Sequence, residues 1–441
     1  MDDPMGREAA GAKPDLTAMV AAALDRLAPD GPLGIAVSGG GDSVALLLAA
    51  QQWAAARGRS IEVATVDHGL RPGSAAEAAG VARQAAALGV PHRTLEAGRL
   101  PSGNINAGAR EARLSLLSGW ARERGLSAIL LGHTLDDQAE TVLMRLGRGS
   151  GADGLAGMAE ASRLLGTLWL RPLLGLRRAA LRDWLAARGA AWVDDPTNED
   201  PAHLRVRLRG LVAALEGAGI PAEAIAASAR RLAAQRRALD RATAVLAAQA
   251  LGVGAAGEIL IDRAALAAAD PEIAGRLVAS CIRAITGAPY APRGEPLAAV
   301  VAGLGAPVPH GATLGGVIAR PSRGGRILMC REPAAAAPPV AIGPAGAVWD
   351  ARWRIGPVGE GLTLGALGEV GTRALPVVLR PEGWDAMPHV VRLTLPAIRR
   401  GDALVAIPLS RGAMPPTRDA IALARAEDLV RERLPCAPDR G

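Results

Sequence analysis

Short apolar runs alternate with longer amphipathic stretches through the first 210 or so residues of the chain. The short runs are bounded by turn-forming residues, which favours strands, whereas the longer stretches repeat their apolar positions with a helical period. Strands are expected at residues 33–37, 61–66, 91–96 and 128–132, and helices at residues 42–57, 74–89 and 106–125. This alternation predicts an α/β fold in which helices cover both faces of a parallel sheet. Ligands of such sheets bind beyond the carboxyl ends of the strands.

Beyond about residue 210 the pattern changes to helices rich in Ala and Arg, expected at residues 221–249 and 262–285. A proline-bearing stretch at residues 331–346 has the composition of a linker or an exposed boundary. After it, short β-like runs are interrupted by Gly and Pro. These changes predict three domains: the α/β domain at 1–210, a helical domain at 211–330 and a small α+β domain at 331–441.

The composition of the chain indicates the cellular compartment of the protein more clearly than its function. Half of the 441 residues are hydrophobic, Phe is absent, and Lys13 is the only lysine among the basic residues. The formal net charge of +7 is modest for this length, so charge alone does not establish a nucleic-acid partner. Cys281, Cys330 and Cys436 lie too far apart for a CxxC or zinc pair, which favours a reducing compartment. The acidic start and the lack of long apolar runs predict a cytoplasmic protein without a membrane partner.

The first predicted strand leads into the hexapeptide SGGGDS, residues 38–43. A turn from a buried strand into a helix leaves backbone N–H groups unpaired, which makes an anion site. Gly39, Gly40 and Gly41 would let this backbone close on phosphate oxygens. Ser38 and Ser43 add hydroxyl donors. The hexapeptide therefore predicts a phosphate-binding loop, with a bare glycine-rich turn as the alternative.

Asp42 distinguishes this loop from two other phosphate loops. A carboxylate repels phosphate unless a cation lies between them, so Asp42 predicts Mg²⁺. The NTPase loop needs a lysine, and this hexapeptide has none. The dinucleotide fingerprint needs a small residue where Val44 stands. The hexapeptide instead resembles the SGGxDS loop of the PP-loop ATP pyrophosphatases, Rossmann-like enzymes that split ATP between its α and β phosphates and adenylylate a substrate.

Four further motifs follow in the chain: VDHGLRPGS at 66–74, GHTLDDQAETVLMRLGRGSGADGLAGM at 132–158, RPLL at 171–174 and DDPTNEDPAHLRVRLR at 194–209. Their order and spacing, over residues 33–209, are similar to those of the tRNA(Ile)-lysidine synthetase family. The resemblance implies an ATP-dependent ligase that acts on tRNA(Ile). Its members adenylylate the wobble cytidine of the CAU anticodon at its C2 oxygen and let the ε-amine of free L-lysine displace AMP, which gives lysidine. The oligomeric state stays open, with a homodimer as one arrangement.

Three carboxylates lie together after the fourth predicted strand. If residues 135–145 form a helix, Glu140 shares a face with Asp136 and Asp137. So close together they repel one another unless they meet cations, and the reaction supplies both Mg²⁺ and the lysine ammonium. We assign Asp137, with Asp42, to metal or substrate positioning and Glu140 to lysine binding or proton removal. The alternative is an acidic first turn that favours the helix dipole.

Other polar residues stand where parallel sheets gather their active sites. His133 directly follows the fourth strand and would donate to a phosphate or to the base, and Asp67 ends the second strand and would frame the adenosine. Each has a purely structural alternative, as a packed histidine and as a polar turn. Among the arginines, the resemblance favours Arg113 and Arg205 as groups that offset charge at the α phosphate. In so arginine-rich a chain, a solvated surface charge is the alternative for each of them.

A helix at residues 221–249 would carry a basic stripe. Arg230, Arg237 and Arg241 fall on one face by helical spacing, opposite an apolar face of Ile225, Leu232 and Leu239. Such a stripe is typical of a surface that follows an RNA backbone, and also of an ordinary solvated helix face. The sequence thus assigns tRNA contact to the 211–330 region.

Three rival functions are weaker. Cytidine 2-thiolation on the same fold depends on paired cysteines, and the first 280 residues contain no cysteine. A small-molecule ligase working with a glutaminase would need a reactive cysteine near the N-terminus. A non-catalytic RNA-binding protein would have no reason to keep Asp42, Asp137 and Glu140.

Overall fold

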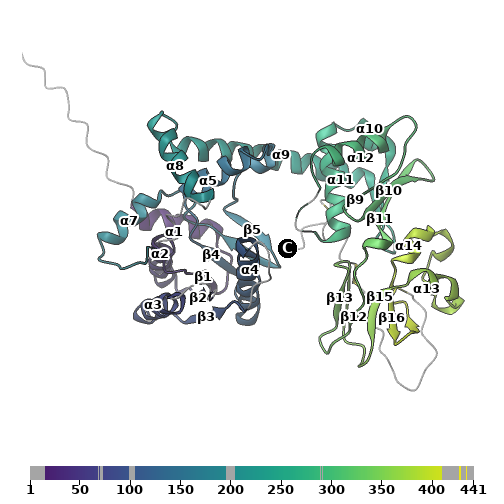
Figure 1. Ribbon diagram of the computed structural model, residues 1–441, viewed down its shortest axis with the longest axis horizontal. Coiled ribbons are helices and arrows are strands. Elements are labelled where there is room, and N and C mark those ends of the chain that lie inside the picture. Colours follow the sequence, from purple (N-terminus) through teal and green to yellow (C-terminus); the bar gives the residue numbers. More distant parts are fainter. Residues whose placement is uncertain are drawn as a thin grey trace, which may run out of the picture. The chain divides into compact units, whose positions relative to one another are not determined.

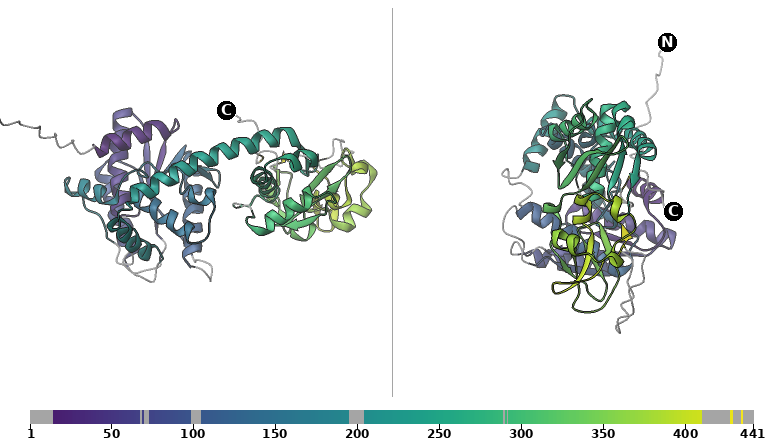
Figure 2. Two further views of the ribbon diagram at one scale, coloured as in Figure 1. Left: turned by 90° about the horizontal axis from the view of Figure 1, so that it is seen from above. Right: turned by 90° about the vertical axis from the view of Figure 1, so that its right-hand side faces the viewer.

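The computed structural model describes residues 15–67, 69, 73–98, 105–194, 204–288, 290, 292–409, 427–428 and 434. The chain divides into two compact units, Met1–Arg236 and Arg237–Gly441. The boundary lies inside one helix, α9 (Ala222–Ala250). Figure 1 labels the elements of both units, and Figure 2 gives two further views. Two of the motifs, at 66–74 and 194–209, are described only in part, because residues 68, 70–72 and 195–203 lie outside the described residues.

A six-stranded sheet forms the centre of the first unit (Figure 1). Its order is β3-β2-β1-β4-β6-β5, and every neighbouring pair is parallel except β5 with β6. The strands are β1 (Leu33–Ala36), β2 (Ile61–Asp67), β3 (His92–Glu96), β4 (Ala128–Leu131), β5 (Ala161–Leu164) and β6 (Thr167–Leu170). The expected α/β fold and its four parallel strands are confirmed. The β5–β6 hairpin was not expected, because Gly166 and charged residues interrupt its apolar pattern.

Helices cover both faces of this sheet, so successive residues of β1 pack into two different cores. Leu33 and Ile35 pack into one core with α1, α2, α3 and α7, whereas Ala36 packs into another core with α4. Strands buried on both faces read as continuous apolar runs, as β1 and β4 do. The helices are α1 (Leu16–Leu27), α2 (Gly41–Arg57), α3 (Ser74–Ala87), α4 (Ile105–Arg124) and α7 (Arg178–Ala186).

Three further helices lie in the described part of the first unit. These are α5 (Leu135–Leu146), α6 (Ala152–Leu155) and α8 (Leu204–Gly217). A small core joins Leu135 and Ala139 of α5 to Val212 of α8 and to the first turns of α9, at Ala222 and Ala226. Within the described residues no single helix is long and apolar enough to cross a membrane, although α8 and α9, which meet at a 104° bend, pass that test as a pair.

The described residues of the second unit form three antiparallel sheets. The largest has the order β7-β8-β11-β10-β9. Its strands are β7 (Leu251–Val253), β8 (Ile259–Asp262), β9 (Ala312–Leu314), β10 (Val317–Ser322) and β11 (Arg326–Arg331). One face packs against α11 (Pro271–Thr286) and α12 (Glu295–Gly305), beside the short α10 (Arg263–Ala268). The predicted single helix at 262–285 is therefore two helices, because Asp270 caps α11 and Pro271 begins it.

Two smaller sheets lie in the C-terminal part of this unit. One has the order β12-β15-β16-β17 and the other β13-β14-β18. Their strands are β12 (Val340–Ala341), β13 (Ala347–Trp349), β14 (Trp353–Ile355), β15 (Thr363–Ala366), β16 (Pro396–Arg400), β17 (Ala403–Ala406) and β18 (Glu427–Asp428). The helical segments between them are η2 (Pro333–Ala335), α13 (Gly368–Ala374), η3 (Val377–Leu379), η4 (Trp384–Ala386) and α14 (His389–Leu393).

The observed units differ from the expected three-domain division. The 211–330 region, expected to be helical, contains the whole five-stranded sheet. Leu328 and Cys330 of β11 pack into one core with Leu367, Trp384 and Ile407. The boundary expected at residue 330 thus lies inside a continuous core, and the stretch at 331–346 holds η2 and β12 instead of acting as a linker.

Candidate active site

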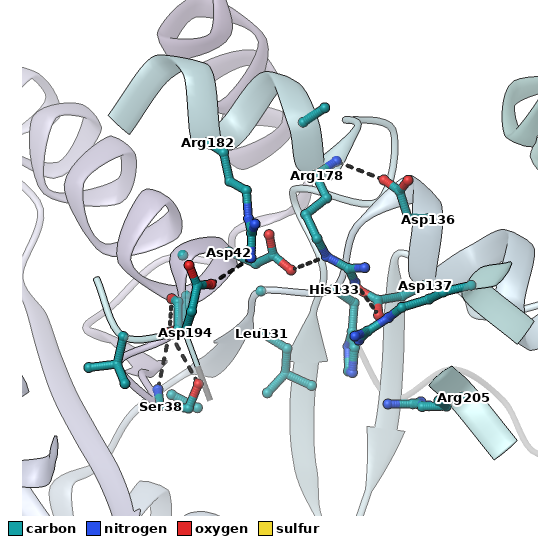
Figure 3. A pocket seen from close by; sticks show the side chains of 18 of the residues that line it. Ser38, Asp42, Leu131, His133, Asp136, Asp137, Arg178, Arg182, Asp194 and Arg205 are labelled. Carbon is teal, nitrogen blue, oxygen red and sulfur yellow. Dashed lines mark hydrogen bonds and ion pairs between the residues drawn. The ribbon is translucent and has the colours of Figure 1, made fainter. Parts of the chain in front are cut away.

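A pocket of about 890 Å³ lies at the carboxyl ends of β1 and β4, where a parallel sheet places its ligands. Figure 3 shows it with its polar side chains. The SGGGDS loop, the start of α5, the start of α7 and the first turns of α8 supply its walls. The predicted site residues that line it are Ser38, Gly40, Gly41, Asp42, Ser43, Arg113, His133, Asp137 and Arg205. Gly39, Asp67 and Glu140 do not line it; Asp67 accepts a hydrogen bond from the N–H of Gly69 at 2.9 Å.

The SGGGDS loop has the backbone of an anion site. Helix α2 begins at Gly41, and its N-cap residue Gly40 offers no capping side chain. Ser43 closes the turn, because its Oγ donates to the Gly40 carbonyl at 2.8 Å and accepts from the Ser38 N–H at 3.2 Å. Gly39 has φ of 89°, which L side chains rarely adopt. Nothing in the described chain accepts from the N–H groups of Gly40, Gly41 and Asp42, so they are available to phosphate oxygens.

Gly132, at the end of β4, fits closely against this loop. A Cβ at this position would lie 3.2 Å from the backbone C and O atoms of Asp42 and from Cα of Ser43. Any side chain would therefore push the loop away from the strand. The absence of a Cβ lets the carboxyl ends of β1 and β4 approach, and it fixes His133 and the start of α5 relative to the phosphate loop.

Asp42 presents one free carboxylate oxygen at the pocket. Its Oδ2 accepts from Nε of Arg178 at 2.9 Å, whereas its Oδ1 is buried without a hydrogen-bond partner. Burial raises the pKa of Asp42, and the nearby Arg178 guanidinium opposes that shift. A buried acceptor without a partner is costly, so Oδ1 is suited to receive a ligand cation.

Asp137 is the most constrained carboxylate of the site. Thr134 is the N-cap of α5, and Asp137 closes a capping box by accepting from the N–H and Oγ1 of Thr134 at 2.8 and 2.9 Å. Its other oxygen accepts from Nη2 of Arg178 at 2.9 Å. Burial alone would raise the pKa of Asp137, but Arg178 and the Thr134 hydrogen bonds outweigh it and hold the pKa below its usual value. Asp137 is therefore an anion in the folded protein.

Glu140 lies deeper than predicted. It is 1 % exposed, and its Oε1 lies 3.1 Å from Nε of Arg209 and 3.6 Å from Nη1 of Arg178. Its Oε2 is buried without a partner. Burial and the neighbouring charge of Asp137 raise the pKa of Glu140. In this conformation Glu140 contacts two of the arginines that line the pocket, Arg178 and Arg209, and is not itself a lining residue.

Arg178 is the central residue that the sequence reasoning missed. Its guanidinium binds Asp42, Asp137 and Glu140, and Figure 3 shows it between Asp42 and Asp137. Its backbone N–H donates to Oδ2 of Asp136 at 2.7 Å. The carboxylates raise the pKa of Arg178 despite its burial. One signal was present in the sequence, because a basic residue at a helix N-terminus opposes the dipole and needs carboxylates nearby.

His133 and Arg113 line the same pocket close to Asp137. Burial lowers the pKa of His133 to about 4, against the opposing effect of Asp137, and its Nδ1 is buried without a partner. His133 is thus a neutral imidazole at physiological pH. Burial and the charges of Arg110 and Arg205 lower the pKa of Arg113. The site combines a region rich in carboxylates with a region rich in guanidinium groups.

The three arginines assigned to RNA lie on α9 and are exposed, whereas Ile225, Leu232 and Leu239 are half-buried. The helix is thus amphipathic in the expected sense. Among the described residues no group of three His, Cys, Asp or Glu side chains has the arrangement of a metal site.

The fold and the phosphate loop define a class of protein. Residues 15–215 match the family model of the PP-loop domain. The chain is 42 % identical to a tRNA(Ile)-lysidine synthase of Ruegeria pomeroyi over 87 % of this chain and 89 % of that protein. It is 44 % identical to one of Methylobacterium sp. (strain 4-46), over 68 % of this chain and 88 % of that protein. The chain belongs to the tRNA(Ile)-lysidine synthase family.

Proposed function

We propose that this protein uses ATP to attach free L-lysine to C2 of the wobble cytidine in the CAU anticodon of tRNA(Ile), which gives lysidine. The names of its relatives identify tRNA(Ile) as their substrate. The observation in this chain that carries the proposal is the phosphate loop, whose free backbone N–H groups lie beside the unpartnered Oδ1 of Asp42. A loop of this kind binds the outer phosphates of ATP as a unit, so pyrophosphate is the leaving group.

Different residues of the pocket act in the two steps of the proposed reaction. In the first, the cytidine O2 attacks the α phosphate, and Arg113 and Arg205 would offset the developing charge. In the second, the ε-amine of lysine attacks C2 and AMP leaves. Asp137 is ionised and would position the incoming amine. Glu140 holds Arg178 and Arg209 in place, and it would accept a proton only when those arginines move away.

Of the two carboxylates assigned to the metal, Asp42 fits Mg²⁺ better than Asp137. Asp42 would hold Mg²⁺, which would supply positive charge to neutralise part of the charge of the ATP phosphates. Asp42 supplies a buried free oxygen for it, whereas both oxygens of Asp137 already have partners. The assignment of Asp137 to the metal therefore requires that Arg178 releases it.

The reaction is tested with the full chain, ATP, radiolabelled lysine and a CAU-anticodon tRNA. We expect labelled tRNA with AMP and pyrophosphate in equal amounts, and ADP as the product would contradict the proposal. Asp42→Asn should abolish pyrophosphate release and leave tRNA binding intact, because Asp42 acts on phosphate charge. Asp183→Asn is the matched control, since Asp183 is exposed on α7 and away from the pocket lining. Normal turnover by Asp42→Asn would rule out the metal role.

We also propose that the exposed arginines of α9, Arg230, Arg237 and Arg241, contact the phosphate backbone of the tRNA. Each phosphate contact contributes about 0.7–0.9 to the slope of log K against log salt. Replacing all three by Gln should lower that slope by about 2, whereas Arg122→Gln, an exposed change on α4, should leave it unchanged. Fluorescence anisotropy with labelled tRNA measures both. Equal slopes for the triple variant and the control would show that the three arginines face solvent and do not contact the tRNA.

A further inference from the structure

The phosphate loop has no basic side chain of its own. In the NTPase loop a lysine reaches the outer phosphates, whereas SGGGDS contains none, and Lys13 lies outside the described residues. In the proposed reaction the cytidine O2 attacks the α phosphorus, the bond to the bridging oxygen breaks, and its electron pair leaves with pyrophosphate. The leaving group thus gains negative charge, which a guanidinium beside the loop would stabilise.

Helix α7 places two arginines on the wall of the active-site pocket. Arg178 and Arg182 share one helix face by their i, i+4 spacing, and both line the pocket. Arg178 is held by Asp42 and Asp137 at 2.9 Å each. In the described part of the chain, Arg182 has a single ion-pair partner, Asp194, whose Oδ1 accepts from Nη2 at 2.6 Å. Figure 3 shows this ion pair among the side chains of the pocket.

Asp194 belongs to a short segment that is attached to the phosphate loop. The backbone N–H of Val193 donates to the Gly39 carbonyl at 2.9 Å. The indole of Trp192 packs over Gly41, where a Cβ would lie 3.4 Å from the ring. Its Nε1 donates to Oδ2 of Asp194 at 3.2 Å. These contacts fix the carboxylate, and with it the guanidinium of its partner, next to the loop that would hold the phosphates.

The ion pair of Arg182 with Asp194 costs little to separate. The two side chains are 48 % and 63 % exposed, and pairs as exposed as this contribute little to stability. A phosphate offers a guanidinium the same kind of paired acceptor oxygens as a carboxylate, with more negative charge. A phosphate group entering the loop would therefore replace Asp194 as the partner of Arg182.

We propose that Arg182 binds the outer phosphates of ATP and the departing pyrophosphate, and that Asp194 is its counterion while no nucleotide is bound. This inference rests on the proposed function and adds the side chain that stabilises the leaving group. Arg182 is then a substrate-contacting residue, and Asp194 is a positioning residue that acts through it. Loss of the guanidinium weakens pyrophosphate binding, whereas loss of the competing carboxylate strengthens it.

Calorimetry with the full chain and no tRNA tests the proposal, with magnesium pyrophosphate and AMP as probes. Arg182→Met should raise the Kd of pyrophosphate about 10- to 100-fold, as expected for a lost charge-assisted hydrogen bond, and leave the Kd of AMP unchanged. Asp194→Asn should lower the Kd of pyrophosphate by up to about fivefold, because the competing ion pair is weak. Arg188→Met, an exposed arginine beyond the end of α7 and outside the pocket lining, is the matched control and should keep both Kd values.

A double variant separates the positioning role of Asp194 from a structural one. In the Arg182→Met background, Asp194→Asn should have no further effect on pyrophosphate binding. An unchanged Kd of pyrophosphate in Arg182→Met, an equal loss for pyrophosphate and AMP, or weaker binding in Asp194→Asn would overturn the inference. The labelled-lysine assay tests the proposed function separately, since pyrophosphate binding that depends on Arg182, without lysine incorporation, would remove that function and leave this inference standing.

Discussion

Replacing Arg178 by Met should destabilise the first unit by about 3 kcal/mol at pH 8. The guanidinium is 19 % exposed, and it lies 2.9 Å from oxygens of Asp42 and Asp137 and 3.6 Å from Glu140. Removing one partner of a buried ion pair costs about 3–5 kcal/mol, because the remaining charge is left uncompensated. We take the lower end because Asp42 keeps partial contact with solvent, at 22 % exposure. Methionine keeps most of the side-chain volume, so the loss reports charge and not a cavity.

The loss of stability in Arg178→Met should depend on pH, and the pKa shifts of the neighbouring carboxyl groups give the direction. Burial already raises the pKa of Asp42 and of Glu140, and removal of Arg178 raises them further. The folded variant then binds protons at pH values where the unfolded chain, with carboxyl pKa values near 4, does not. Each proton so bound restores up to about 1.4 kcal/mol per pH unit. The deficit relative to wild type should therefore shrink between pH 8 and pH 5.

Hydrogen exchange of peptides from α5 and α7 in the full chain measures the local free energy of opening. Arg182→Met is the matched control, since Arg182 lies one turn further along α7 in an exposed pair with Asp194, at 48 % and 63 % exposure. Such pairs contribute less than about 1 kcal/mol. A deficit below about 1 kcal/mol for Arg178→Met, or one that grows on acidification, would refute the reasoning.

Two shorter predictions concern the end of β4. Gly132→Ala should raise KM for ATP and lower the free energy of unfolding by about 1–3 kcal/mol, because its Cβ would meet the backbone of Asp42. Gly175→Ala is the control, since a Cβ there meets open space. Equal behaviour of the two variants in ATP titrations and urea unfolding would contradict the steric argument. The imidazole signal of His133 should not titrate by NMR between pH 8 and pH 5.5, because burial lowers its pKa to about 4. Its depressed pKa also means that its contribution to stability is lost as pH falls from 6.5 toward 4, and a midpoint near 6.5 would show that it is not buried as described.

Local signals were enough to predict the parallel sheet and the phosphate loop. The strands β1, β2 and β4 are short, mainly apolar runs, and a strong helical pattern follows each of the four strands β1 to β4. The loop at 38–43 carries its chemistry within six residues. The helix considered at 135–145 is observed as α5, and Asp137 lies in its first turn.

The contacts of Arg178 could not be predicted from spacing. Its partners Asp42 and Asp137 are 136 and 41 residues away, so only the packing of α7 against the sheet brings them together. The same limit applies to Glu140, whose burial depends on Arg209 of α8, 69 residues away.

The sheet of the second unit was missed for a different reason. Strand β11 has apolar residues from Ile327 to Cys330, which do not alternate because helices cover one face and the C-terminal core covers the other. Short strands such as β7 and β9, with three residues each, carry too little pattern to be distinguished from loops.

The ion pairs of Arg178 affect how this site binds divalent metal ions. The guanidinium of Arg178 already neutralises part of the negative charge of Asp42, Asp137 and Glu140, which lowers the affinity of these carboxylates for free divalent ions. On the proposed function, loading of magnesium nucleotide would be an exchange of cations at Asp42, and the apparent affinity for Mg²⁺ would follow that of the nucleotide. Without the guanidinium, the three carboxylates would be open to free calcium or zinc.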